Sequence, residues 1–407
     1  MCFPRKVSRI SIFILLPMLL TSTMRITPNA STSSVKKDFF VGVWLGMYSD
    51  YWPSEKTEWL RKVDESFMSL REAGVDAIYF LAKDPWGYVY YESKYAPLSE
   101  KYSWDPLREV VAKAREHGLQ IYPYVNALAE GESQPNFYLK EHPELAVSPA
   151  NGENGWVDPS SEEYVDRLLS IIEEIVSNYD VDGVQLDRIR MPSPVIRAKA
   201  SEKLYMETTG LSPGSDEKKW QEFVKSQVSK VVQKVCEKVK SIDRGLKFSA
   251  AVFPSPSNAA VNQLQDWRKW VEEGWVDYVC TMAYAQGFYV FKSYVDEEKM
   301  ACEPEKLYVG IGAWQLSPSE LKKQIKYVAV DSGLPGVLLF NADSLLSNRE
   351  LLNAVREAKD GKFEEDSSFF TNLFSTASVI ILFCATLSLL YQLRKKPGKN
   401  VSQKKAY

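Results

Sequence analysis

The chain has 407 residues, of which 45% are hydrophobic and 25% are charged. This length and composition are sufficient for one large domain with a buried core. Its 50 basic and 53 acidic residues give a formal net charge of −3, so nucleic acid is excluded as a partner for want of a basic surface.

Residues 1–34 predict a signal peptide or an N-terminal anchor, followed by a spacer. Three basic residues lie among the first nine and precede an apolar run at residues 10–20. This run has the length of a signal-peptide core and is too short to span a bilayer. Residues 21–34 are rich in serine and threonine and lack a clear cleavage site. Removal and retention of the segment therefore both stay open.

Residues 36–360 alternate short apolar runs with longer amphipathic stretches, which is typical of βαβ units and a parallel sheet. We expect strands at residues 40–45, 77–81, 119–125, 183–186, 246–253, 276–282, 307–311 and 336–340. Eight strand–helix units in this order predict an α/β fold, a single-domain (β/α)8 TIM barrel. An open doubly wound sheet is the alternative. It is disfavoured because no glycine-rich phosphate loop follows the first strand.

Capping residues mark the ends of several connecting helices. Asp105 and Ser317 each precede a proline, which is the pattern of an N-cap followed by proline at the first helical position. Gly118 is a typical residue for ending a helix. The long insertion at residues 191–243 is expected to hold a loop and two helices.

The C-terminal region predicts a membrane anchor. After a linker at residues 361–368, residues 369–393 contain no charged residue and are long enough to span a bilayer as a transmembrane helix. The tail at residues 394–407 begins with three basic residues, and acidic residues precede the apolar segment. The positive-inside rule then places the tail in the cytoplasm. We expect a single-pass protein of the cell membrane whose domain at residues 36–360 is extracellular.

The chain carries no pattern of metal ligands. It has only two histidines, and its five cysteines are scattered without a CxxC pair. We therefore expect neither a metal nor another cofactor.

Aromatic, amide and guanidinium side chains cluster after the predicted strands, where TIM barrels place their active sites. The candidates for substrate binding are Trp44, Trp86, Tyr124, Asn126, Trp156, Arg188, Arg190, Tyr284, Trp314 and Asn341. Flat aromatic rings stack on sugar rings, and the polar side chains bind hydroxyl groups. This set predicts a carbohydrate cleft. For any one aromatic residue, the alternative is that it only fills the barrel mouth.

Asp187 is the strongest candidate for a catalytic carboxylate, because it directly follows the apolar strand at residues 183–186. At a strand end it is placed to act as a general acid that protonates the leaving glycosidic oxygen. The alternative is an ion pair with Arg188 or Arg190 that only shapes the loop.

Most glycosidases use a second carboxylate. Asp84 and Asp343 are candidates because they also follow predicted strands, and Glu130 or Glu303 could reach the site from loops. An N-acetyl group of the substrate is the alternative nucleophile, which would leave the protein to supply only an acid and an orienting group.

Five sequence blocks occur in an order that resembles the glycosyl-hydrolase-like family 10 of barrel proteins, over residues 39–358. The blocks are residues 42–45 (GVWL), 156–159 (WVDP), 179–192 (YDVDGVQLDRIRMP), 276–284 (VDYVCTMAY) and 336–341 (GVLLFN). The resemblance implies a TIM barrel, an extracellular setting and glycan hydrolysis. The chain is also distantly similar to the barrel that hydrolyses partly deacetylated poly-N-acetylglucosamine, which implies a role for Asp187. It departs from the family pattern at Arg188, Met191 and Val224.

These observations predict a glycoside hydrolase that acts on an extracellular or cell-surface polysaccharide, with Asp187 in its chemistry. A catalytically silent glycan-binding protein is the alternative, favoured by the absence of an obvious second carboxylate. A third hypothesis is a scaffold whose barrel contacts another protein.

Overall fold

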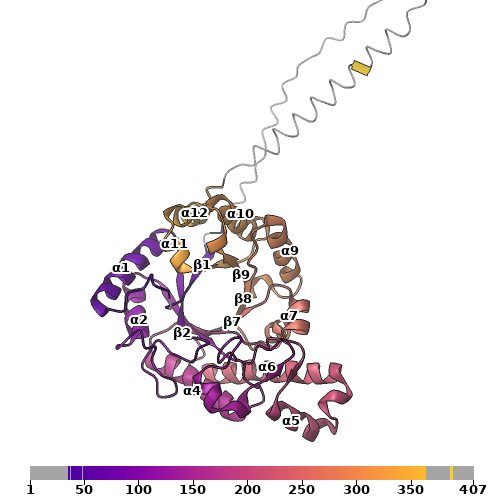
Figure 1. Ribbon diagram of the computed structural model, residues 1–407. Helices are drawn as coiled ribbons and strands as arrows, with labels where there is room; N and C mark the ends of the chain where they lie inside the picture. Colours follow the sequence, from indigo (N-terminus) through magenta and orange to yellow (C-terminus); the bar gives the residue numbers. More distant parts are fainter. Residues whose placement is uncertain (1–34, 37, 48, 364–385, 388–407) are drawn as a thin grey trace, which may run out of the picture. The chain divides into compact units, whose positions relative to one another are not determined.

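Eight parallel strands form a closed barrel in a computed structural model that describes residues 35–36, 38–47, 49–363 and 386–387 (Figure 1). The strands are β1 (Phe40–Leu45), β2 (Ala77–Lys83), β3 (Gln120–Asn126), β5 (Gly183–Asp187), β7 (Lys247–Val252), β8 (Tyr278–Met282), β9 (Leu307–Gly312) and β10 (Gly336–Phe340). Their order around the barrel is β1-β10-β9-β8-β7-β5-β3-β2. All eight predicted strands are confirmed, and closure of the sheet excludes the open alternative.

The helices surround the barrel, as Figure 1 shows. They are α1 (Lys56–Glu72), α2 (Pro106–Glu116), α3 (Phe137–Glu141), α4 (Glu162–Asn178), α5 (Lys199–Thr209), α6 (Glu217–Ile242), α7 (Pro256–Asn262), α8 (Trp267–Glu272), α9 (Phe288–Lys299), α10 (Pro318–Lys326), α11 (Ala342–Leu346) and α12 (Arg349–Lys359). The predicted N-caps are confirmed, because Asp105 accepts from the backbone N–H of Arg108 and Ser317 from that of Glu320.

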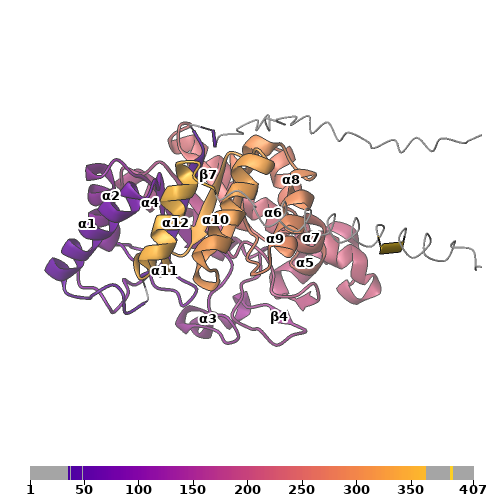
Figure 2. The same cartoon turned by 90° about the horizontal axis from the view of Figure 1, so that it is seen from above.

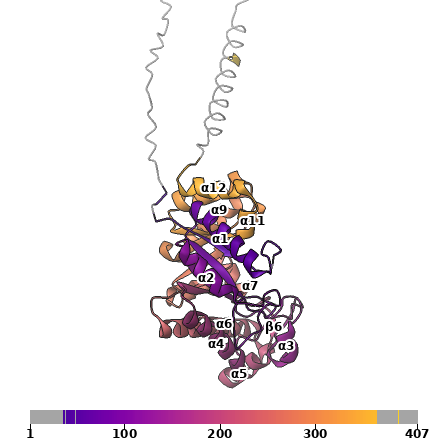
Figure 3. The ribbon, with the colours of Figure 1, turned by 90° about the vertical axis from the view of Figure 1, so that its left-hand side faces the viewer.

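Two excursions extend the chain beyond the C-terminal ends of β3 and β5. The first contains α3 and β4 (Ser148–Pro149), which Figure 2 shows projecting from one end of the barrel. The second contains β6 (Ile196–Arg197) and α5 and leads into α6, so the predicted loop and two helices of the long insertion, α5 and α6, are confirmed. β4 and β6 pair in an antiparallel manner, and Figure 3 shows the labels of β6 and α3 on the same side of the molecule. The pairing of β4 with β6 therefore joins the two excursions at the C-terminal end of the barrel.

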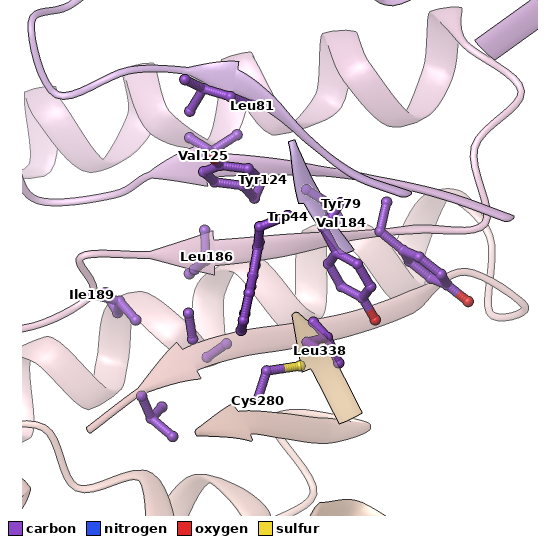
Figure 4. Packing of buried hydrophobic residues seen from close by; sticks show 14 of the residues in the cluster. Trp44, Tyr79, Leu81, Tyr124, Val125, Val184, Leu186, Ile189, Cys280 and Leu338 are labelled. Atoms are coloured by element: carbon purple, nitrogen blue, oxygen red, sulfur yellow. The ribbon is translucent and has the colours of Figure 1, made fainter. Parts of the chain in front are cut away.

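Large aromatic side chains fill the barrel interior (Figure 4). Near the N-terminal ends of the strands, the hydroxyl groups of Tyr79 and Tyr278 lie 2.7 Å apart. Closer to the C-terminal ends of the strands, the Trp44 Nε1 donates a hydrogen bond of 2.7 Å to the Gln185 Oε1. A Cβ atom on Gly310 would lie 3.0 Å from the Trp44 ring, so β9 carries glycine where the indole packs. These contacts make the interior a packed core, and in TIM barrels the active site lies at the C-terminal ends of the strands.

No helix within the described ranges is both long and apolar enough to cross a membrane. The predicted N-terminal segment at residues 1–34 and the predicted tail at residues 394–407 lie outside the described residues. So does the predicted membrane helix at residues 369–393, except for residues 386 and 387.

Candidate active site

A cavity of about 160 Å³ opens at the C-terminal end of the barrel. Its lining residues are Trp44, Tyr124, Asp187, Arg188, Arg190, Ala251, Met282, Tyr284 and Phe340. These residues lie on or directly after barrel strands, as the TIM-barrel rule requires of an active site. A larger hollow of about 750 Å³ is lined mainly by α5 and α6, and no residue of a barrel strand lines it.

Asp187 is the last residue of β5, is partly exposed and lines the cavity. Its Oδ1 accepts a hydrogen bond of 2.7 Å from the backbone N–H of Arg188. The φ angle of Arg188 is +49°, in the left-handed region that non-glycine residues rarely adopt. The chain therefore turns sharply after β5, and the backbone N–H of Arg188 points at the carboxylate of Asp187.

The charge of Arg188 is directed away from Asp187. Its Nη2 forms an ion pair of 2.5 Å with the Glu132 Oε1 in the loop before α3. Asp187 forms no ion pair with any residue that the structure describes, and no described donor bonds to its Oδ2. The alternative role of Asp187, an ion pair that only shapes the loop, is therefore absent from the described structure.

Arg190 lies between two aromatic rings. Its guanidinium carbon is 4.8 Å from the centroid of the Trp156 ring and 5.0 Å from that of Phe253. Burial lowers the pKa of Arg190 to about 10, although the nearby Asp187 carboxylate acts in the opposite direction. Arg190 is still a cation at neutral pH.

An aromatic wall runs from the barrel core to the surface and consists of Trp44, Phe340, Tyr284 and Trp314. The ring of Tyr284 meets Trp44 edge-on at 6.4 Å and Trp314 edge-on at 5.1 Å, both measured between centroids. Phe340 packs against Tyr284 at 5.6 Å. Trp314 is 48% exposed, so it extends this wall beyond the cavity. A continuous aromatic surface of this kind suits the apolar faces of sugar rings.

The other two predicted carboxylates do not line the cavity. Asp84 is buried and accepts hydrogen bonds from the backbone N–H of Tyr88 at 3.0 Å and from the Tyr90 hydroxyl at 3.1 Å. Asp343 accepts from the Ser49 hydroxyl and, at 2.9 Å, from the Trp52 Nε1. Burial raises the pKa of each carboxyl group. Both acids hold loop segments in place through neighbouring donors.

The remaining predicted binding residues lie around or away from the cavity. Trp156 is buried behind Arg190, and Asn126 is buried with its amide donating to the Lys83 carbonyl. Trp86 is exposed in the loop after β2, and Asn341 caps α11 through its Oδ1. The structure thus brings together Trp44, Tyr124, Asp187, Arg188, Arg190 and Tyr284, with Trp314 at the rim.

Two features of the site and its surroundings were not predicted from the sequence. Ala251, Met282 and Phe340 complete the cavity, and their position at strand ends could have revealed them. Glu130, expected as a loop acid, is instead fully buried between Lys83 at 3.1 Å and Arg167 at 2.8 Å. No local sequence pattern joins these three residues.

The family model described as Glycosyl hydrolase-like 10 matches residues 40–329, which span the barrel from β1 to beyond β9. The chain belongs to this family. A relative, the glycosyl hydrolase DigH of Escherichia coli K12, is 25% identical over 75% of this chain and 83% of its own length. The glycosyl hydrolase YngK of Bacillus subtilis is 23% identical over 68% of this chain and 61% of its own length.

Among solved structures, the PgaB (BpsB) glycoside hydrolase domain of Bordetella bronchiseptica superposes with a TM-score of 0.60 and 13% identity. The match covers 79% of this chain and 99% of that domain. At this identity the likeness shows the shared barrel fold. Family membership and the barrel together support a glycoside hydrolase.

Proposed function

We propose that this protein hydrolyses a polysaccharide at the C-terminal end of its barrel, with Asp187 as the general acid. One observation carries the proposal. Among the described residues that line the cavity, Asp187 is the only carboxylate; its Oδ1 is held by a backbone N–H, and its Oδ2 accepts no hydrogen bond from a described residue. A positioned acid beside an aromatic wall is what protonation of a glycosidic oxygen requires.

The second catalytic group comes from the substrate in this proposal. Asp84 and Asp343 are engaged by neighbouring donors outside the cavity lining, which favours neither as a nucleophile. An N-acetyl group on the sugar can attack its own anomeric carbon while Asp187 protonates the leaving oxygen. This route favours an amino-sugar polymer as the substrate.

The proposed site of action is outside the cell. The apolar segment at residues 369–393 and the basic residues after it support a single-pass anchor with the barrel on the outer side. Polysaccharides of the cell surface are then within reach of the cavity.

A catalytically silent glycan-binding protein is the second candidate. It is favoured by the presence of one carboxylate rather than two among the described lining residues. Such a protein would use the same aromatic wall for binding and would release no product.

The test uses the full chain, incubated with a panel of polysaccharides that includes amino-sugar polymers, with products read by mass spectrometry. We expect cleavage by the native protein and a loss of at least about 100-fold in rate for Asp187→Asn, the scale of general acid catalysis. Asp166→Asn is the matched control, because Asp166 is exposed on the outer helix α4. Full activity of Asp187→Asn would refute the assigned role. Binding without cleavage in both proteins would favour the silent alternative.

A further inference from the structure

Arg190 lines the cavity without an ion-pair partner among the described residues. Its Nε is shielded from solvent without a hydrogen-bond partner. Within the described part of the chain, its guanidinium donates no hydrogen bond and forms no ion pair. Its contacts there are with the rings of Trp156 and Phe253.

Asp187, Glu153 and Glu132 lie near enough to favour the charged form of Arg190, but none of them forms an ion pair with it. Glu132 is bonded to Arg188 at 2.5 Å, and the Oδ1 of Asp187 is held by the backbone N–H of Arg188. Desolvation of a charge without a partner is costly, and the lowered pKa of Arg190 reflects this. The two aromatic rings attract the cation but leave its N–H donors available.

The charges that line the cavity indicate what fits there. Arg188 is paired with Glu132, which leaves Arg190 as the cation of the cavity lining that has no ion-pair partner among the described residues. A neutral sugar would leave the guanidinium donors without a charged acceptor. A carboxylate supplies one negative charge and two oxygens whose geometry matches the guanidinium fork.

We infer that the cavity binds a sugar ring that carries a carboxylate, as uronic acids do, and that Arg190 is the residue that binds this carboxylate. The inference rests on the proposed function in taking a glycan as the ligand, and it names the class of that glycan. The acidic ring is oriented with its carboxylate toward Arg190, and the amino sugar of the proposed function is its neighbour across the glycosidic bond whose oxygen faces Asp187.

The test measures binding of the full chain to oligosaccharides of three uronate polymers: alternating N-acetylglucosamine and glucuronic acid, polygalacturonate, and polymannuronate. Each is compared with the same oligosaccharide after chemical reduction of its carboxylates to alcohols. Calorimetry at about 0.15 M salt suppresses nonspecific attraction between charges. At least one acidic form is expected to bind about 10- to 100-fold more tightly than its reduced form, the scale of a charged hydrogen bond.

Variants identify the residue responsible. Arg190→Gln is expected to abolish the preference for the acidic form, and Arg190→Lys to retain part of it, because lysine keeps the charge but loses the fork. The lysine variant also serves if the glutamine variant fails to fold. Arg268→Gln, at an exposed arginine on α8 that pairs with Glu272, is expected to keep the full preference.

The outcomes separate this inference from the proposed function. Equal binding of acidic and reduced forms, binding of neither, or a preference that survives in both Arg190 variants would overturn the inference. Cleavage of a neutral polymer without any acidic preference would overturn it too, while leaving the hydrolase proposal standing. Acid-selective binding that depends on Arg190, without cleavage of any polymer, would support the inference and count against hydrolysis.

Discussion

The buried carboxylate of Glu130 pairs with two cations near the C-terminal end of β2. Glu130 bonds to Lys83 at 3.1 Å and to Arg167 at 2.8 Å, and it also accepts from the Tyr164 hydroxyl at 2.8 Å. Burial alone would raise the pKa of Glu130, but Lys83 and Arg167 outweigh it and hold that pKa below its ordinary value. Lys83 also donates to the backbone carbonyl of Asn126, which pairs in register with Asp187.

Glu130→Gln is expected to lower the free energy of unfolding by about 3–5 kcal/mol, because it leaves both cations buried without a counter-ion. Urea denaturation measures the change. Glu100→Gln, at an exposed loop glutamate, is the control and should shift stability by less than about 0.5 kcal/mol. A similarly small effect of Glu130→Gln would show that the cluster contributes little to stability.

Strand β9 carries a glycine, Gly310, where it packs against strand β8 and the Trp44 ring. A Cβ atom on Gly310 would lie 2.1 Å from the backbone carbonyl oxygen of Thr281 and 3.0 Å from the Trp44 ring. The first contact involves the neighbouring strand β8, whose backbone cannot move aside cheaply. The absence of a side chain at Gly310 therefore allows both the pairing of β9 with β8 and the position of the Trp44 indole in the core.

Gly310→Ala is expected to destabilise the protein by about 1–3 kcal/mol, as overpacking does, and to change the fluorescence of the buried tryptophans. Gly214→Ala is the matched control, because a Cβ atom there would meet nothing within 4 Å. Thermal unfolding of the two variants side by side measures the difference. Equal stability of the two variants would contradict the packing argument.

At the scale of the whole molecule, a buried acid makes stability depend on pH. Glu298 of α9 is fully buried, and its Oε2 accepts from the Thr281 hydroxyl at 3.0 Å. Burial raises the pKa of Glu298 from 4.5 to about 8. The folded protein therefore keeps a proton that the unfolded chain releases. The resulting stabilisation is complete below about pH 4.5 and is lost as the pH rises to about 8.

The contribution of Glu298 to the free energy of unfolding is expected to fall by a few kcal/mol between pH 5 and pH 8. Glu298→Gln, which is neutral throughout, should flatten this dependence, whereas Glu273→Gln at an exposed position should not. Urea denaturation across the pH range measures both. An unchanged slope in Glu298→Gln would show that this carboxyl group is not responsible.

The sequence predicts the barrel because each strand is a local apolar run and each helix has local caps, as at Asp105 and Ser317. It also predicts Asp187, which simply continues a buried strand. Asp84 follows β2 in the same way, yet the register of β2 shifts between Leu81 and Lys83 and the chain folds back so that Tyr88 and Tyr90 bond to the acid. Such long-range and irregular geometry has no signature in a single sequence.

The hydrogen bond between Trp44 and Gln185 joins β1 and β5, which are not neighbours in the barrel. Trp44 lines the cavity, so this hydrogen bond holds the base of the cavity, its floor, from two separate strands. A substrate must therefore adapt to the floor, and the two braced excursions above it are the parts free to vary. A change of sugar preference is then expected to come from the two paired excursions changing together, while the barrel and its Trp44–Gln185 hydrogen bond stay the same.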